Sequence, residues 1–283
     1  MAASKTNLHI RSNSLPTKSH PAIEECNDHL IRLGASRVAS SSSSSSIAHQ
    51  LSGLEDLHLC VERLLELPLT QQAFSQGRQE KWVDELVDGS LRLLDICSVA
   101  KDAVLHTKEC ARDIQSTMRR KVSLESEIKK YSASRKVVKK AIQKALGGLK
   151  GAESKYTSSP SNKDSEISAL VGVFREVEVI TLATFESLMS FVSGPKTHSK
   201  LNGWSVVSKL MQSKRVGCDD EVANEFAKVD AVLLSHEKIN KGDQAMQDLK
   251  NLEMCIQDFE QMLESLFRRL IKTRVSLLNI LNN

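Results

Sequence analysis

The C-terminal segment, residues 249 to 281, constrains the fold more than any other part of the chain. Apolar residues recur there with alternating spacings of three and four, interrupted only by Thr273: Leu249, Leu252, Ile256, Phe259, Leu263, Leu266, Leu270, Leu277 and Ile280. This spacing places them on one side of an α-helix about 48 Å long. Further apolar residues widen the stripe: Met262, Phe267, Ile271, Leu278 and Leu281. A stripe of this width predicts burial within a bundle rather than a two-stranded coiled-coil seam.

The rest of the chain also favours helices. Apolar residues make up 40% and aromatic residues only 4%, so the core must consist mainly of Leu, Ile, Val and Ala, which suits helix packing. Helical spacing of apolar residues recurs over 51–65, 82–103 and 167–188. Gly89 lies on the apolar face of the second segment, which indicates close approach of another helix.

We therefore predict an all-α fold, an elongated multi-helix bundle with a long C-terminal helix and a disordered N-terminal tail. Residues 1–46 are interpreted as a mostly disordered tail, a short helix over 22–33 and a linker of seven serines, Ser40 to Ser46. Residues 47–283 form the helical bundle domain, with a flexible loop over 147–165 and shorter helices over 201–211 and 221–246. The predicted core includes Trp82, Leu86, Leu252, Ile256, Phe259, Leu263, Leu266, Leu270 and Leu277.

The cysteines and the lack of targeting signals point to an intracellular protein. The chain has 6 cysteines without a Cys-x-x-Cys pair, and no apolar signal segment follows its N-terminus. We therefore expect free thiols and a protein that is not secreted. The expected compartment is the cytoplasm, with the nucleus as the alternative. No apolar run approaches the roughly 18 residues of a membrane span.

Three stretches resemble a known family. They are RSNSLP at residues 11–16 with His20-Pro21, WVDELVDGSLRLLD at residues 82–95, and LESLFRRLIKTRVSLLNI at residues 263–280. Together they resemble a plant-specific family of uncharacterised helical proteins related to the BYPASS regulators of root and shoot development. This resemblance implies a developmental or signalling role, and it supplies no catalytic residues.

Motifs for catalysis, metals or phosphate loops are incomplete in this chain. A di-iron bundle needs two Glu-x-x-His pairs, and the chain has only Glu55 with His58. His236-Glu237 resembles the start of a zinc-protease helix, but Asn240 stands where the second histidine is required. The glycines of residues 147–151 lack the spacing of a phosphate-binding loop. We therefore expect a protein that is not an enzyme, with no catalytic, cofactor-binding or metal-binding residues.

A basic amphipathic segment, residues 128–150, is a candidate binding surface. It contains no acidic residue and many basic ones: Lys129, Lys130, Arg135, Lys136, Lys139, Lys140 and Lys144. Such a helix can attract anionic lipid or an acidic protein. Its apolar stripe, however, is what any bundle helix with a solvated outer face shows, and this favours the second explanation. Nucleic acid is disfavoured because Tyr131 is the only aromatic residue for base stacking there.

The N-terminal tail contains a second candidate site, a phosphorylation and adaptor motif. Arg11, Ser12, Ser14 and Pro16 match the Arg-Ser-x-Ser-x-Pro pattern that 14-3-3 adaptors bind once the second serine is phosphorylated. Taken together, the sequence predicts a regulatory or scaffold protein that acts by binding other proteins. The alternative is a peripheral membrane or acidic-partner binder acting through 128–150.

Overall fold

The computed structural model describes residues 20–39, 43–149, 165–194, 224–234 and 242–282. Every regular element in these ranges is a helix, which confirms the predicted all-α class. The helices are α1 (Pro21–Ala39), α2 (Ser44–Glu66), α3 (Pro68–Gln76), α4 (Lys81–Arg119), α5 (Glu125–Leu149), α6 (Ser165–Ser193), α8 (Glu225–Leu234) and α9 (Gly242–Asn282).

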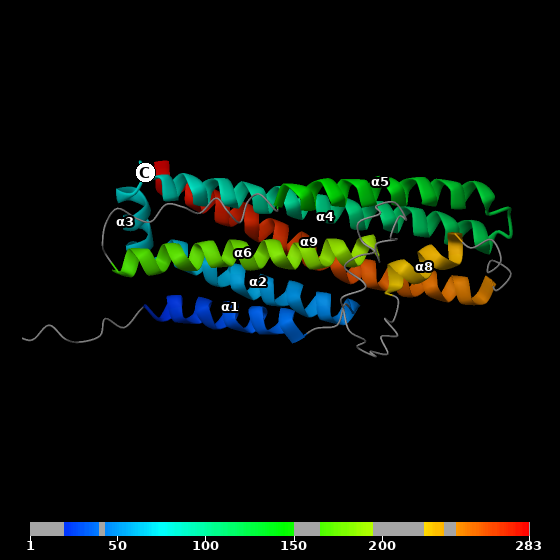
Figure 1. The fold of residues 1–283 in the computed structure, drawn as a ribbon, viewed down its shortest axis with the longest axis horizontal. Coiled ribbons are helices and arrows are strands. Elements are labelled where there is room, and N and C mark those ends of the chain that lie inside the picture. The colour runs from blue at the N-terminus through cyan, green and yellow to red at the C-terminus, as the bar shows by residue number, and fades with distance from the viewer. Residues whose placement is uncertain (1–19, 40–42, 150–164, 195–223, 235–241, 283) are drawn as a thin grey trace, which may run out of the picture.

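The helices form an elongated bundle in which α9 is the central element. Figure 1 shows the long helices lying side by side along one axis, with the short α3 across one end. Helix α9 packs mainly against α4 and α2, while α1 packs on α2 and α6. Helix α5 lies on α4, and α8 lies on α9. The long C-terminal helix is thus in contact with both halves of the chain.

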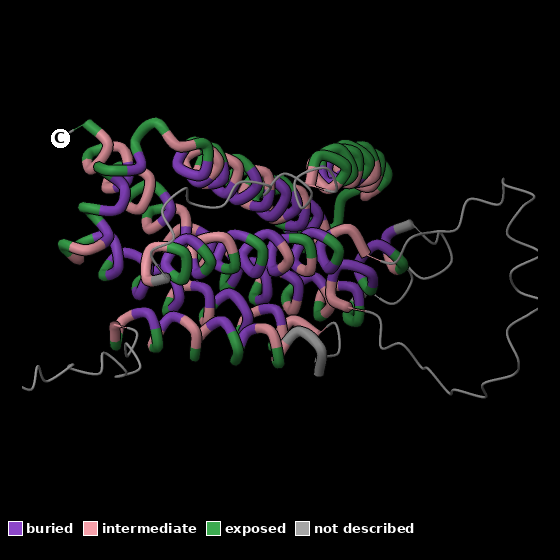
Figure 2. The backbone as a smooth tube through the Cα atoms, turned by 60° about the vertical axis from the view of Figure 1, so that its left-hand side comes forward, coloured by how far each residue is buried: buried purple, intermediate pink, exposed green. Residues whose placement is uncertain are grey.

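The core follows the apolar stripes, as Figure 2 shows by the buried positions on the inner sides of the helices. All nine core side chains named from the sequence are buried: Trp82, Leu86, Leu252, Ile256, Phe259, Leu263, Leu266, Leu270 and Leu277. The added apolar residues of α9 are less well covered. Ile271 is 42% exposed, and Met262 and Phe267 are only partly buried.

Local signals explain where several helices begin. The Ser43 side chain accepts a hydrogen bond from the backbone N–H of Ser46 at 3.2 Å, so α2 starts with a serine cap inside the serine run. Pro68 ends α2 and takes the first position of α3, where its missing N–H costs nothing. Helix α1 is not an isolated segment, because Ile23, Leu30 and Leu33 are buried against the bundle.

Several predicted boundaries differ from the observed ones, and one helix was not predicted. The short helix predicted over 22–33 runs to Ala39, and α2 begins at Ser44, inside the predicted serine linker. Helix α9 begins at Gly242 rather than near 249. The prediction of one helix over 221–246 is wrong, because α8 ends at Leu234 and the residues from Gly242 onward belong to α9. Helix α3 has nine residues, too few for a clear periodic stripe. The predicted helix over 201–211 and most of the predicted loop over 147–165 lie outside the described residues.

Buried carboxylates join helices that are distant in sequence. Glu62 of α2 is 6% exposed and contacts Arg269 at 3.3 Å and Lys272 at 2.7 Å on α9. Glu178 of α6 is 4% exposed and contacts Arg92 of α4 at 2.9 Å. Both carboxylates are buried, whereas their basic partners reach the surface and Lys272 is 61% exposed. Removing the basic partners would leave a buried, unpaired carboxylate.

Gly89 makes room for the second of these pairs. A Cβ atom at position 89 would overlap the Glu178 carboxylate oxygen Oε2. The close approach expected at this glycine is therefore made by a side chain of α6. Because Gly89 has no Cβ, the Glu178 carboxylate has room to reach Arg92.

We expect Gly89→Ala to lower the free energy of unfolding by about 1–3 kcal/mol, because the added methyl group displaces a buried, paired carboxylate. Gly172→Ala is the matched control, since a Cβ at that exposed helical position meets nothing within 4 Å. Alanine there should stabilise the helix by up to about 1 kcal/mol. Urea unfolding of both variants tests this, and a Gly89→Ala variant as stable as the control would contradict it.

Candidate functional site

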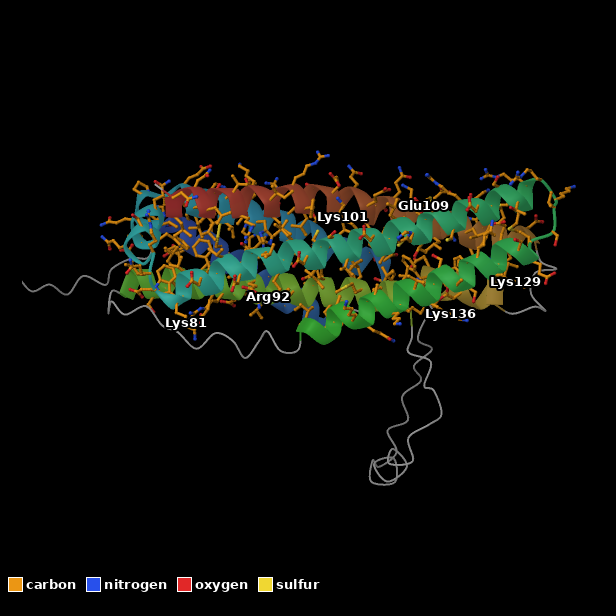
Figure 3. All side chains as sticks on the ribbon, turned by 90° about the horizontal axis from the view of Figure 1, so that it is seen from above. Lys81, Arg92, Lys101, Glu109, Lys129 and Lys136 are labelled. Atoms are coloured by element: carbon orange, nitrogen blue, oxygen red, sulfur yellow. A yellow bond between two sulfur atoms is a disulfide. The ribbon has the colours of Figure 1, made fainter. Side chains whose placement is uncertain are left out.

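Helix α5 presents lysines on the side that faces away from the bundle. Its inward side chains Tyr131, Val138 and Ile142 are buried. Its outward lysines are all exposed: Lys129, Lys130, Lys136, Lys140 and Lys144. Figure 3 shows Lys129 and Lys136 along this helix. The segment is therefore an amphipathic helix packed through its apolar side.

The first two of these lysines are neutralised within α5. Lys129 Nζ lies 2.7 Å from Glu125 Oε1, and Lys130 Nζ lies 2.9 Å from Glu127 Oε1. Lys136, Lys140 and Lys144 follow at four-residue intervals, and within the described part of the chain no ion pair involves them. We call these three residues the lysine face. They span about 12 Å along the helix.

Arg135 was predicted to belong to this basic surface, and that prediction is wrong. Its side chain is only 4% exposed, and its guanidinium contacts the Asp230 carboxylate of α8, with Nε and Nη2 each 2.9 Å from a carboxylate oxygen. Nη2 also donates to the Val192 carbonyl at 2.8 Å. A charged residue can lie on the inward side of α5 because an acidic partner meets it there.

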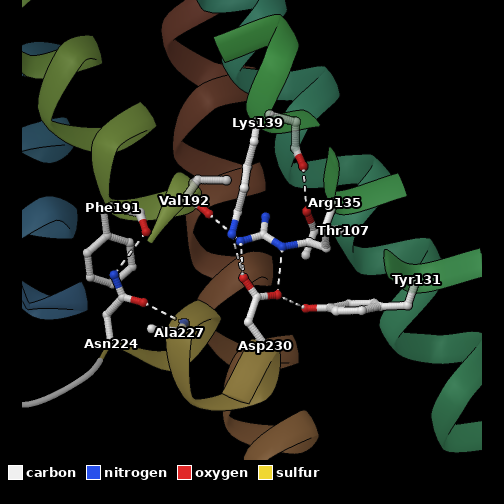
Figure 4. A network of polar contacts seen from close by, with 10 residues as sticks. Thr107, Tyr131, Arg135, Lys139, Phe191, Val192, Asn224, Ala227 and Asp230 are labelled. Atoms are coloured by element: carbon white, nitrogen blue, oxygen red, sulfur yellow. Dashed lines mark hydrogen bonds and ion pairs between the residues drawn. The ribbon is translucent and has the colours of Figure 1, made fainter. Parts of the chain in front are cut away.

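Lys139 belongs to the same cluster (Figure 4), with its Nζ 3.0 Å from Asp230 Oδ2. The Tyr131 hydroxyl donates to Asp230 Oδ1 at 2.7 Å. Burial would by itself raise the pKa of Asp230, but hydrogen bonds and charge from Arg135 hold this pKa below its ordinary value. Burial, together with the nearby Asp230 carboxylate, raises the pKa of Tyr131, so its hydroxyl remains a donor.

This cluster has a positioning role. It fixes α8 and the end of α6 against α5, and so sets the direction in which the lysine face points. Lys139 is already paired with Asp230 in this cluster. The exposed lysines of α5 without an ion pair in the described residues are therefore Lys136, Lys140 and Lys144.

His58, the histidine of the single Glu-x-x-His pair, is buried and faces α6. Its Nε2 lies 3.0 Å from Thr181 Oγ1. The Thr181 hydroxyl donates to the Val177 carbonyl at 2.6 Å, so its oxygen must accept from the imidazole. His58 therefore carries its proton on Nε2. In the described residues no group of three His, Cys, Asp or Glu side chains could hold a metal ion, and His236, Glu237 and Asn240 lie outside those residues.

The cysteines were expected to be free thiols, and for two of them this is wrong. Cys26 of α1 and Cys60 of α2 are joined, with Cα atoms 5.9 Å apart, a distance that a disulfide can span. The packing of α1 on α2 brings together two residues that lie 34 positions apart. Burial raises the pKa of Cys97 to about 12 and also raises that of Cys255, so neither is a reactive thiolate. Cys218 lies outside the described residues.

Two open clefts lie along α9. A cleft of about 340 Å³ between α2, α8 and α9 is lined by Ser44, Glu225, Lys228 and Asp258 among others. A cleft of about 450 Å³ near α3 is lined mainly by amide, hydroxyl and aliphatic side chains. The motif residues Arg11, Ser12, Ser14 and Pro16 lie outside the described residues. None of the helices described is both long enough and apolar enough to cross a membrane.

Comparison with known proteins assigns the chain to a family. The sequence model described as Protein BPS1 matches residues 50–280, so the chain belongs to the BPS1 family. This agrees with the BYPASS-like resemblance: the stretches 82–95 and 263–280 lie within the match, whereas 11–16 lies before it. The match contains most of α2, all of α3 to α8 and nearly all of α9, whereas α1 precedes it. It therefore includes the lysine face on α5. No curated protein and no solved structure matches the chain.

The buried histidine predicts how stability changes with pH. Burial, followed by the charge of Arg269, lowers the pKa of His58 from 6.5 to about 4. Between these values the unfolded chain binds a proton that the folded chain does not. The contribution of His58 to the free energy of unfolding is therefore complete above pH 6.5 and falls by roughly 3 kcal/mol as the pH drops to about 4.

Urea unfolding at several pH values tests this for the wild type and for His58→Gln. In the variant, the decrease in the free energy of unfolding between pH 6.5 and about 4 should be smaller by roughly 3 kcal/mol. His106→Gln, at a side chain that is 61% exposed, is the control and should keep the wild-type fall. An unchanged fall in His58→Gln would show that other groups cause it.

Proposed function

We propose that this member of the BPS1 family is a non-enzymatic helical regulatory or scaffold protein that acts by binding other proteins in plant root and shoot development. The developmental part of this proposal rests on the family resemblance. The binding part rests on α5, and the single observation that carries it is the lysine face.

The lysine face makes no ion pair within the described part of the chain. Like charges four residues apart destabilise a helix by a few tenths of a kcal/mol per pair, and in the described part of the chain no acidic residue pairs with Lys136, Lys140 or Lys144. The remaining basic residues of α5 do have partners, Glu125, Glu127 and Asp230. Three lysines left together on a rigid helix are best explained by an anionic partner outside the chain.

The non-enzymatic part of the proposal is supported by where the reactive side chains lie. His58 is buried against Thr181 with a lowered pKa, and the thiols of Cys97 and Cys255 have raised pKa values. None of them combines solvent access with a neighbour that would activate it for acid–base or nucleophilic chemistry.

A second candidate function is attachment to an anionic membrane surface through the same lysines. Val137 favours it, because this side chain is 66% exposed among them and could enter the headgroup region. The attraction would be modest, about 1 kcal/mol for each lysine near the surface, since the rest of the apolar side of α5 is buried in the bundle. We also propose that phosphorylation of Ser14, with Arg11, Ser12 and Pro16, recruits a 14-3-3 adaptor and so adds regulation.

Purification of bound proteins from the native tissue tests the proposal directly. The wild type should capture a set of proteins that is lost from Lys136→Glu, Lys140→Glu, Lys144→Glu, because this variant reverses the lysine face and spares Lys139. The control is Arg78→Glu, Lys228→Glu, Lys250→Glu, which makes the same change in net charge at other exposed positions and should capture what the wild type does.

Equal capture by the wild type and the lysine-face variant would overturn the proposed binding surface. Flotation of the same proteins with phosphatidylserine vesicles separates the two candidate functions, because only a membrane role predicts recovery of the wild type and control but not of the variant. A Ser14→Ala arm should lose 14-3-3 and nothing else.

A further inference from the structure

Helix α4 has an exposed face with the opposite charge to that of α5. Asp88, Asp95 and Asp102 lie on it at seven-residue intervals, all exposed. The next position of this series is Glu109, which contacts His106. We call Asp88, Asp95 and Asp102 the acidic stripe. Its neighbouring members are about 10.5 Å apart along the helix.

The stripe is left without counter-charges because α4 uses its basic residues internally. Lys101 and Lys108 pair with Glu264 and Glu260 of α9, and Arg112 Nε lies 2.8 Å from Glu253 Oε1. In the described part of the chain no ion pair involves the three aspartates of the stripe. Figure 3 shows Lys101 and Glu109 along the same helix.

Exposed leucines accompany the stripe. Leu91 is 44% exposed and Leu105 is 43% exposed. They lie 14 residues apart, two intervals of the same seven-residue spacing, and so share one edge of the acidic stripe. Apolar side chains beside a line of charge are what a partner helix with the same spacing can cover.

The lysine face has the features that complement this stripe. Lys136 and Lys144 are about 12 Å apart along α5, close to the 10.5 Å between successive acids. Val137, the most exposed apolar side chain of α5, lies beside these lysines and would meet the leucine edge. One face thus offers regularly spaced cations beside an apolar side chain, and the other offers regularly spaced anions beside leucines.

Within the described part of one chain, no ion pair joins the two faces. Helix α5 packs on α4 with its buried side, the side of Tyr131, Val138 and Ile142, turned to the bundle. Its lysines consequently point away from the bundle to which α4 belongs. We propose that the acidic stripe of one chain binds the lysine face of a second copy. This inference rests on the proposed function, because it assigns a partner to the same lysine face.

Sedimentation velocity of charge-reversed chains tests the contact. The wild type should associate at low ionic strength and dissociate at about 1 M salt, where the screening length falls to about 3 Å. Asp95→Lys, Asp102→Lys has two basic faces and should be monomeric. Lys136→Glu, Lys140→Glu has two acidic faces and should be monomeric as well. An equimolar mixture of the two variants should associate again, since each then meets the opposite charge.

Two controls separate this contact from a general effect of net charge. Asp28→Lys, Asp56→Lys and Arg78→Glu, Lys250→Glu change the net charge equally at exposed positions elsewhere, and each should associate like the wild type. Circular dichroism establishes that all variants are folded. A mixture that stays monomeric, or single variants that associate like the wild type, would overturn the inference.

Failure of this inference is distinguishable from failure of the proposed function. A monomeric wild type that still captures tissue proteins through Lys136, Lys140 and Lys144 contradicts self-association and leaves the proposed function standing. A wild type that self-associates but captures nothing else supports this contact and contradicts a scaffold role.

Discussion

The antiparallel contact between α4 and α9 is the interaction on which the rest of the structure depends. Its core is the α9 stripe, and its edge is a series of ion pairs in which α4 supplies the bases and α9 the acids: Lys101 with Glu264, Lys108 with Glu260 and Arg112 with Glu253. Near the other end, Arg274 donates to the Val87 carbonyl at 2.7 Å. As residue numbers rise along α4 they fall along α9, so these contacts fix a single register over most of both helices.

The outer surface follows from that register. Lys101, Lys108 and Arg112 of α4 pair with acids of α9, whereas the acidic stripe lies on the exposed side of α4. Helix α5 packs on α4 in the reverse direction. The buried Arg135–Asp230 cluster orients α5, so the charged faces of α4 and α5 are held on rigid helices rather than on loops. The family match, residues 50–280, spans both helices.

The sequence predicts local features well and contacts between distant residues poorly. The long stripes of α4 and α9 are periodic over many turns, so their helices and core residues could be identified from spacing alone. Arg135 was assigned to the surface because its partner Asp230 lies 95 positions away and only folding brings the two together. The Cys26–Cys60 pair was missed for the same reason. Lys139 could not be distinguished from its neighbours, because basic residues of a helix differ only in what packs against them.

The most direct test of this account is whether the α9 stripe is buried within one chain. Leu270→Asp places a charge at a side chain that is 2% exposed, whereas Ile271→Asp places it at one that is 42% exposed. Urea unfolding should show that Leu270→Asp lowers the free energy of unfolding by several kcal/mol, through an unpaired buried charge. Ile271→Asp should change it by less than about 1 kcal/mol. A Leu270→Asp variant that unfolds like the wild type would show that the stripe is exposed, and would contradict the central place of the α4–α9 contact.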